Sequence, residues 1–163
     1  MDDVVVREAR GAEVGQAIAV ADRAFASVRQ VYRPRRDVAA HEAQRASLGT
    51  RLVALCGAGI VGTLQFEVHA EHVHVIGLAV APEHQGRGVA RRLLAALEAR
   101  APALGRSVLA LDTIRETGNV ARFEALGFRT ISEAPTDLFE SDTFERLHEV
   151  KMERAVARTD RRD

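Results

Sequence analysis

The stretch Val80–Leu94 most constrains how this chain can fold, because it joins an apolar strand to an amphipathic helix through two closely spaced glycines. The first turn of a helix leaves N–H groups without partners, and these donors attract anions together with the positive end of the helix dipole. Gly86 and Gly88 carry no Cβ atom, so the backbone can approach a phosphate closely. Positive charge is added by Arg87, Arg91 and Arg92. The sequence therefore predicts a pyrophosphate site at this turn.

The glycine spacing is neither that of a dinucleotide-binding fingerprint nor that of a P-loop. Instead, Gln85–Ala90 resembles the Q/R-x-x-G-x-G/A signature of the GNAT family of N-acetyltransferases, which bind acetyl-CoA. Three further segments resemble that family in order and spacing: His72–Val80 its fourth strand, Val108–Leu111 its fifth, and Asn119–Phe128 the helix that ends in its Gly-Phe pair. The likeness covers about residues 4–155. The alternative, a turn whose glycines only allow tight packing, agrees less well with the whole segment.

Length and composition point to a globular chain. The 163 residues are 47% apolar and 28% charged, which is typical of a folded protein rather than a disordered one. We expect one N-acetyltransferase domain over residues 1–155 and a charged, frayed tail over 156–163. A formal net charge of zero argues against binding of nucleic acid or of an anionic membrane through a general field. With one cysteine, no long apolar run and an acidic start, we expect a cytoplasmic protein without a disulfide.

Patterning along the chain predicts an α/β fold with a mixed sheet. Alternating or apolar runs predict strands at Val4–Arg7, Arg51–Cys56, Ile60–Val68, His72–Val80, from Val108, Phe128–Ser132 and Leu147–Glu153. Apolar residues at helical spacing predict helices at Val14–Val28, at Val38–Leu48 with Asp37 as its cap and Gly49 as its stop, after the two glycines, and from Asn119. Val31–Arg36 and Ala134–Glu145 are interpreted as loops. The resemblance implies a GNAT-like sheet of about seven strands, flanked by about four helices, whose central parallel strands splay apart.

The resemblance also implies where acetyl-CoA binds. The pantetheine arm pairs with the open edge of the family's fourth strand, which corresponds here to Leu78, Ala79 and Val80. The pyrophosphate binds at Gln85, Gly86, Arg87, Gly88, Val89 and Ala90, with Arg91 beside them. Asn119 falls where a family side chain reaches the pantetheine, although an asparagine is equally suited to cap the helix. Phe123 stands where many family members carry the tyrosine that protonates the departing thiolate, and a phenyl ring cannot donate a proton.

Acetyl transfer to an amine needs a base whose pKa lies near neutral, and two histidines are candidates. His72 and His74 lie two residues apart on one predicted strand, so they project from one face, which continues to Val80. The resemblance places His74 where family members that act on arylalkylamines carry a histidine, and His72 where others carry a glutamate. The alternative is that both are half-buried sheet histidines without a catalytic role. Glu67 on the neighbouring strand is a further candidate base, or an exposed carboxylate.

Several residues admit weaker hypotheses. A metal could bind His69, His72 and His74, but His69 is expected to project differently and no cysteine or carboxylate set completes a site, so we expect no metal. Tyr32, the only tyrosine, could replace the missing acid or line the acceptor site. The arginines of Tyr32–Arg36 form a solvated loop, or attract an anionic acceptor or the cofactor. Cys56 is interpreted as a packed core thiol.

The sequence is compatible with three functions. The first is an enzyme in which a primary amine of a small molecule or peptide attacks acetyl-CoA directly. The second is a module that binds acyl-CoA as a sensor without turnover, and it is motivated by Phe123. The third is a nucleotide-binding domain that prefers ATP or NAD to CoA. The expected partners are acetyl-CoA and an amine set by the loops 31–37 and 134–145, and the chain is expected to be a monomer or a homodimer.

Overall fold

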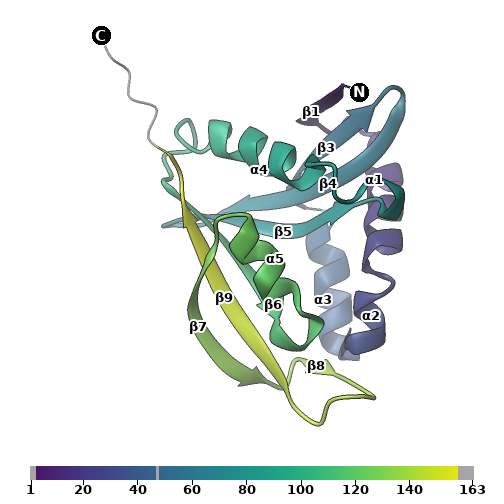
Figure 1. Cartoon of the computed structure of the whole chain (residues 1–163), viewed down its shortest axis with the longest axis vertical. Coiled ribbons are helices and arrows are strands. Elements are labelled where there is room, and N and C mark those ends of the chain that lie inside the picture. The colour runs from purple at the N-terminus through teal and green to yellow at the C-terminus, as the bar shows by residue number, and fades with distance from the viewer. Residues whose placement is uncertain (1–2, 47, 158–163) are drawn as a thin grey trace.

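The computed structural model describes residues 3–46 and 48–157. Its centre is a mixed sheet with the strand order β1-β3-β4-β5-β6-β9-β7 (Figure 1). Only β5 and β6 are parallel neighbours within this sheet, as far as the described residues show. The strands are β1 (Val4–Glu8), β3 (Thr50–Cys56), β4 (Gly59–Val68), β5 (Val73–Val80), β6 (Val108–Ile114), β7 (Arg129–Thr136) and β9 (Leu147–Ala155). The predicted α/β fold with a seven-stranded mixed sheet is confirmed.

Helices cover both faces of the sheet. In Figure 1, α4 (Val89–Arg100) and α5 (Asn119–Ala125) lie in front of the sheet. The helices α1 (Glu13–Phe25), α2 (Val28–Val31) and α3 (Arg36–Ala46) lie behind it. Two short 3₁₀ turns, η1 (Pro82–His84) and η2 (Arg115–Thr117), lead into α4 and α5. No helix in the described ranges is long and apolar enough to cross a membrane.

The main core lies between the sheet and α4. The predicted apolar face of α4 is buried through Val89, Leu93, Leu94 and Leu97, while Ala90 is half-buried. These side chains pack against sheet residues that include Leu52, Leu64, Phe66, Val75 and Leu109. Because full burial of one leucine side chain contributes roughly 1.5–3 kcal/mol, this face holds the start of α4 firmly against the sheet.

Strand β4 is covered on both faces, whereas its alternating sequence predicted one polar face. The side chains of Thr63 and Gln65 are buried although they lie on that polar face. Each is satisfied by a hydrogen bond: the Thr63 hydroxyl donates to the carbonyl of Leu52 (2.8 Å), and the Gln65 amide donates to the carbonyl of Arg45 on α3 (2.8 Å). The helices behind the sheet therefore cover polar side chains, and the hydrogen bonds offset the free-energy cost of burying them.

A bulge at Gly77 changes the course of β5. The register pairs Gln65 with Ile76 but Thr63 with Ala79, so β5 carries one extra residue at this point. Gly77 accommodates it with a φ of +61°, a left-handed conformation that favours glycine. The extra residue reverses the side-chain alternation. The prediction that one face continues from His74 to Val80 is therefore wrong.

The bulge changes which residues of β5 face the main core: odd-numbered Val73 and Val75 do so before it, even-numbered residues after it. Leu78 and Val80 pack against the main core with α4. His74 instead lies opposite Glu67, whose carboxylate contacts Arg45 of α3. The bulge thus places the end of β5 beside the start of α4 and leaves His74 on the side of α3.

The parallel strands β5 and β6 separate soon after they meet. In the part of the chain that the structure describes, they pair only at Val73 with Leu109 and at His74 with Ala110. Beyond these pairs β6 follows β9 along its whole length, while β5 follows β4 (Figure 1). The predicted splaying of the central strands is confirmed, and it leaves the far half of β5 without a neighbour on its β6 side.

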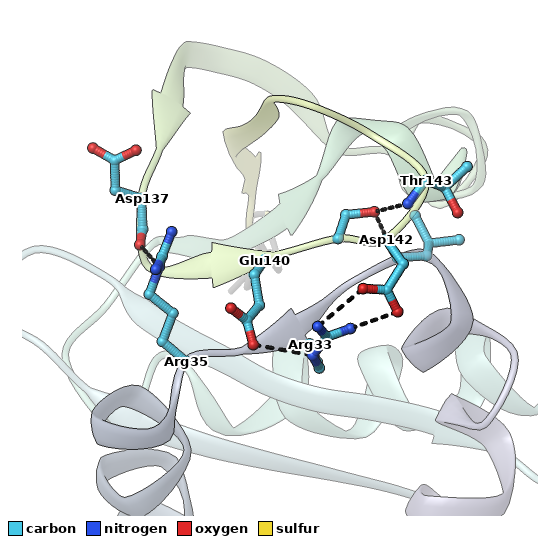
Figure 2. A network of polar contacts seen from close by, with 8 residues as sticks. Arg33, Arg35, Asp137, Glu140, Asp142 and Thr143 are labelled. Carbon is cyan, nitrogen blue, oxygen red and sulfur yellow. Dashed lines mark hydrogen bonds and ion pairs between the residues drawn. The ribbon is translucent and has the colours of Figure 1, made fainter.

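The two segments interpreted as loops contain strands, and this part of the prediction is wrong. β2 (Arg33–Pro34) pairs antiparallel with β8 (Phe139–Glu140), and β7 extends to Thr136. Figure 2 shows Arg33 bonded to Glu140 and Asp142, each at 3.0 Å. Arg35 donates to the carbonyl of Asp137 (Figure 2). The partners are more than 100 residues apart, so no local pattern could indicate this pairing.

Helix boundaries differ from the prediction in a few places. α1 ends at Phe25, before the predicted Val28, and α3 begins at Arg36, so Asp37 lies in its first turn rather than at its cap. Gly49 does not have a positive φ, so it is not a left-handed stop. A Cβ atom there would lie 2.2 Å from the Gln65 amide nitrogen, so glycine is required by this close approach.

The expected tail, 156–163, lies largely outside the described residues. Its first two residues are held in place rather than frayed. The N–H of Val156 donates to the carbonyl of Ser107 (2.8 Å), and the N–H of Ala157 donates to the carboxylate of Glu98 (2.6 Å).

The contact between β4 and α4 yields a stability test at Gly62. A Cβ atom on Gly62 would lie 2.8 Å from Val89 Cγ1 and 3.2 Å from the carbonyl oxygen of Ala79, which belongs to the sheet backbone and cannot move aside cheaply. We expect Gly62→Ala to lower the free energy of unfolding by about 1–3 kcal/mol in urea titrations. The control is Gly15→Ala in α1, where a Cβ atom meets open space. This variant should raise the free energy of unfolding by about 0.5–1 kcal/mol. Equal stability of Gly62→Ala and wild type would contradict this packing.

Candidate functional site

The turn between η1 and α4 presents a row of unbonded backbone donors. Gly86 and Gly88 have φ values of +76° and +81°, and a Cβ atom on either would meet open space. The first helical bond of α4 runs from the N–H of Arg92 to the carbonyl of Gly88 (3.1 Å). Within the described residues, the N–H groups from Gly86 to Ala90 have no acceptor. The predicted anion site therefore has free donors at the positive end of a twelve-residue helix.

Side chains tie this turn to its surroundings. The Gln85 amide donates to the carbonyl of Val80 (3.1 Å), which joins the turn to the end of β5. Arg91 donates to the carbonyl of Ala125 at the end of α5 (2.9 Å). Arg92 donates to the carbonyl of Val4 (2.9 Å), so it serves to hold β1. Among the described residues, Arg87 is exposed and has no such partner, which leaves its charge available beside the turn.

The open edge of β5 is formed by alternate residues. The N–H of Ala81 donates to the carbonyl of Val61 on β4 (2.8 Å). Because successive residues of a strand direct their N–H groups to opposite edges, Ala79 also faces β4, whereas Leu78 and Val80 face the opening toward β6. The carbonyl of Val80 already accepts the Gln85 amide. Of the three residues predicted to form the edge, two therefore offer their N–H groups to a ligand, and Ala79 does not.

Asn119 and Phe123 lie on α5, beyond the end of β6. Gly118, with a φ of +78°, is the N-cap of α5, so the alternative that Asn119 caps this helix is wrong. The Asn119 N–H donates to the Thr117 hydroxyl (3.2 Å), while its half-buried side-chain amide has no bond within the described residues. The Phe123 ring packs edge-on against Phe128 at 6.1 Å, so it serves the core and supplies no proton donor.

Three imidazole rings gather where β4 turns into β5. The N–H of His69 donates to the carbonyl of His72 (2.9 Å), and this turn folds the His69 ring back over the strand. Ring centroids of His69 and His72 are 4.9 Å apart, those of His69 and His74 are 5.1 Å apart, and those of His72 and His74 are 5.6 Å apart. The expectation that His69 projects away from the other two is therefore wrong.

His74 has one partnered and one free ring nitrogen. Its Nε2 atom lies 3.5 Å from Oδ2 of Asp112 on β6. Its Nδ1 atom is buried and has no hydrogen-bond partner, and the same holds for Nε2 of His72. Burial is the main cause that lowers the pKa of His74, and the neighbouring His69, His72 and Arg45 lower it further, while Asp112 raises it. The His74 imidazole is thus favoured in its neutral form, as a proton acceptor must be.

Glu67 is a poor candidate for a base. Arg45 of α3 binds its carboxylate through two bonds of 2.9 Å, and His69 lies 3.0 Å from the same group. The Arg45 guanidinium is the main cause that lowers the pKa of Glu67, to about 2. The carboxylate is therefore ionised and fully engaged at neutral pH, which favours a structural role.

The histidine cluster does not form a metal site of ordinary geometry. The His69 and His74 rings are stacked with an interplanar angle of 22°, so their nitrogens do not converge on one point. Throughout residues 3–46 and 48–157, no group of three or more His, Cys, Asp or Glu side chains is arranged to hold a metal ion.

The remaining candidates take structural positions. Tyr32 meets Phe139 edge-on at 5.2 Å, and burial raises the pKa of its phenol, so it stays protonated. Arg33 is paired with two carboxylates, which leaves it unsuited to attract an anionic acceptor. Cys56 is half-buried and packs against the main core, as its strand sequence predicted.

Comparisons with known proteins agree with this geometry. The model of the acetyltransferase (GNAT) family matches residues 16–128. No curated protein sequence matches the chain significantly. Among solved structures, the ribosomal-protein-S18-alanine N-acetyltransferase of Escherichia coli is 16% identical, with 99% of each chain covered and a TM-score of 0.72.

Two further structures were solved with ligands. An acetyltransferase from Salmonella typhimurium with its cofactor acetyl-CoA is 20% identical over 98% of each chain, with a TM-score of 0.66. An aminoglycoside 6'-N-acetyltransferase in complex with coenzyme A is 13% identical, covers 94% of this chain and 98% of its own, and has a TM-score of 0.70. At such identities the structures establish a shared fold. Because the family model covers more than half of the sequence, the protein belongs to the GNAT acetyltransferase family.

Proposed function

We propose that the protein is an enzyme that transfers the acetyl group of acetyl-CoA to a primary amine of a small molecule or peptide by direct attack. The observation that carries this proposal is the presence of two sets of free backbone donors on consecutive segments of the chain. The open edge of β5 is followed, after the η1 turn, by the unbonded N–H groups from Gly86 to Ala90. One molecule that joins an extended amide arm to a diphosphate would use both sets, and acetyl-CoA is such a molecule.

The residues present fit this cosubstrate. The N–H groups of Gly86, Arg87, Gly88, Val89 and Ala90 would bind the diphosphate, and the charge of Arg87 would add to their attraction. Gln85 and Arg91 would act indirectly, because their side chains fasten the turn to β5 and α5.

Two further parts of the opening would bind the pantetheine arm and the thioester. The free N–H of Val80 would pair with the arm, and the side-chain amide of Asn119 is free to reach it from α5. The free N–H of Leu78 would polarise the thioester carbonyl, as a donor of an oxyanion hole does.

His74 would accept the proton of the attacking amine. The amine nitrogen forms a bond to the carbonyl carbon, the carbon–sulfur bond breaks, and the sulfur leaves as a thiolate. The ammonium proton passes to the imidazole of His74, whose buried Nδ1 atom would have to be uncovered for the transfer, and His72 is the second candidate through its Nε2 atom, which is buried as well. Phe123 cannot donate a proton, so the sulfur would leave as a thiolate without a general acid, which its low basicity relative to an alkoxide allows, and it would later equilibrate with protons of the solvent.

Phe123 also favours a second candidate function, a module that binds acyl-CoA as a sensor without turnover. Calorimetry would show acetyl-CoA binding under both proposals. Release of free thiol in the presence of a panel of amines and peptides occurs only if the protein is an enzyme. Micromolar binding without thiol release from any acceptor would therefore replace the first proposal with the second.

The cellular context of the proposal follows from composition. We infer a cytoplasmic protein in which residues 1–155 act as one N-acetyltransferase domain, as a monomer or a homodimer. The zero formal net charge supports partners that are small molecules or peptides rather than nucleic acid or a membrane surface. The single half-buried Cys56 suits a reducing compartment.

The diphosphate site can be tested with a pair of glycines. We expect Gly88→Val to abolish acetyl-CoA binding in calorimetry, because its side chain would occupy the space above the free amides. The matched control is Gly105→Val: Gly105 has a φ of +69° and open space, but lies after the far end of α4. Both variants bear a similar backbone strain of about 1–3 kcal/mol. Equal affinities in two folded variants would refute the placement of the diphosphate.

The proton acceptor can be tested by pH dependence. A neutral imidazole is needed, so kcat/KM of the wild type should fall as the pH falls through the pKa of His74, which burial places below the ordinary 6.5. In His74→Ala, we expect this fall of kcat/KM at low pH to disappear and kcat to decrease about 100-fold. The control, His41→Ala, removes an exposed histidine of α3 and should change neither. An unchanged pH profile in His74→Ala would reassign the role, with His72→Ala as the next variant to measure.

A further inference from the structure

We propose that Asp112 is a positioning residue that orients the His74 ring, so that Nε2 carries the proton and the buried Nδ1 keeps the lone pair that accepts a proton. This inference rests on the proposed function, because it takes His74 as the proton acceptor. Neither the motif around the glycines nor the alternation of the strands points to Asp112, which lies 38 residues away from His74 in the sequence.

The topology of the sheet brings the two side chains together. His74 pairs with Ala110, which is the last register pair between β5 and β6. Asp112 lies two residues further along β6, so its side chain projects from the same face as that of Ala110. The Asp112 carboxylate therefore sits where the strands begin to separate, 3.5 Å from Nε2 of His74.

The unpartnered ring nitrogen of His74 bears on which tautomer the ring adopts. A neutral imidazole carries one N–H group, and a carboxylate beside one nitrogen favours the proton on that nitrogen. With the proton on Nε2, the buried and unpartnered Nδ1 is left as an acceptor. The His74 side chain is only 14% exposed, so bulk water does not compete with Asp112 for the ring N–H group. This is the arrangement of an acid residue that orients a base, in which the orienting group never touches the substrate.

Asp112 differs from the other charged and titratable groups around His74 in its effect on the pKa of that ring. His69 and His72 face it from the turn, Arg45 faces it from α3, and Glu67 lies opposite it on β4. The carboxylate of Glu67 is engaged by Arg45 and His69. Among these neighbours, Asp112 alone raises the pKa of His74, whereas burial, His69, His72 and Arg45 lower it. Once His74 has accepted a proton, the Asp112 carboxylate would stabilise the imidazolium.

The first measurement is the tautomer and titration of the His74 ring by nitrogen-15 NMR. In Asp112→Asn the side-chain amide can turn its NH₂ group toward Nε2, which favours the proton on Nδ1. We expect the tautomer to shift toward Nδ1–H and the pKa of His74 to fall, because a negative charge is lost. Glu153→Gln is the control, since it removes a carboxylate of the neighbouring strand β9 that does not act on His74, and it should change neither. An unchanged His74 tautomer and titration in Asp112→Asn would overturn the inference.

The second measurement separates this role from binding of the cosubstrate. We expect Asp112→Asn to lower kcat at least 10-fold with an unchanged KM for acetyl-CoA, and Asp112→Glu to recover part of the loss. In a His74→Ala background, Asp112→Asn should have no further effect on the rate, because its only route of action is gone. An equal fold-loss in both backgrounds would overturn the inference, since Asp112 would then act without His74.

The two proposals fail in different ways. If no acceptor gives thiol release, the proposed enzymatic function fails. The NMR measurement needs no turnover, so it still decides whether Asp112 orients His74.

Discussion

The early separation of β5 and β6 is the constraint on which the rest of the structure depends. Parallel neighbours normally share a ladder of hydrogen bonds along their length, but among the described residues these two share it only at Val73 and His74. Each donor left open at such an edge costs free energy unless water or a ligand satisfies it. Strand β5 stays paired with β4 on both sides of the bulge at Gly77, and β6 is paired with β9 along its length. The fold thereby maintains an unpaired strand edge inside a sheet.

The bulge also changes which residues of β5 face each layer. After Gly77, even-numbered side chains enter the main core with α4, so burial of apolar surface holds the end of the strand against the start of the helix. The Gln85 amide completes this junction from the turn. Before Gly77, His74 faces α3 and the polar groups around Arg45. The proposed cosubstrate site uses the open edge of β5, and the proposed proton acceptor His74 lies on the α3 side of the same strand.

The sequence predicts features that depend on neighbouring residues, and it misses those that depend on distant ones. The turn from Gly86 to Ala90 was predictable because glycine spacing and helical periodicity are local. The effect of Gly77 was missed, because a bulge leaves the run of strand residues looking continuous. The pairing of β2 with β8 and the approach of Asp112 to His74 involve residues far apart in the chain, and no periodicity encodes them. His69 was misjudged because its direction depends on a turn, not on strand alternation.

The central claim is that the edge of β5 and the amides after it form one site for one molecule. Amide spectra recorded during titration with acetyl-CoA and with acetyl-pantetheine, which lacks the diphosphate, test it most directly. We expect both compounds to shift the amide signals of Leu78 and Val80. Only acetyl-CoA should shift those from Gly86 to Ala90. Signals from 86–90 that stay unchanged with acetyl-CoA, while others elsewhere move, would contradict the account.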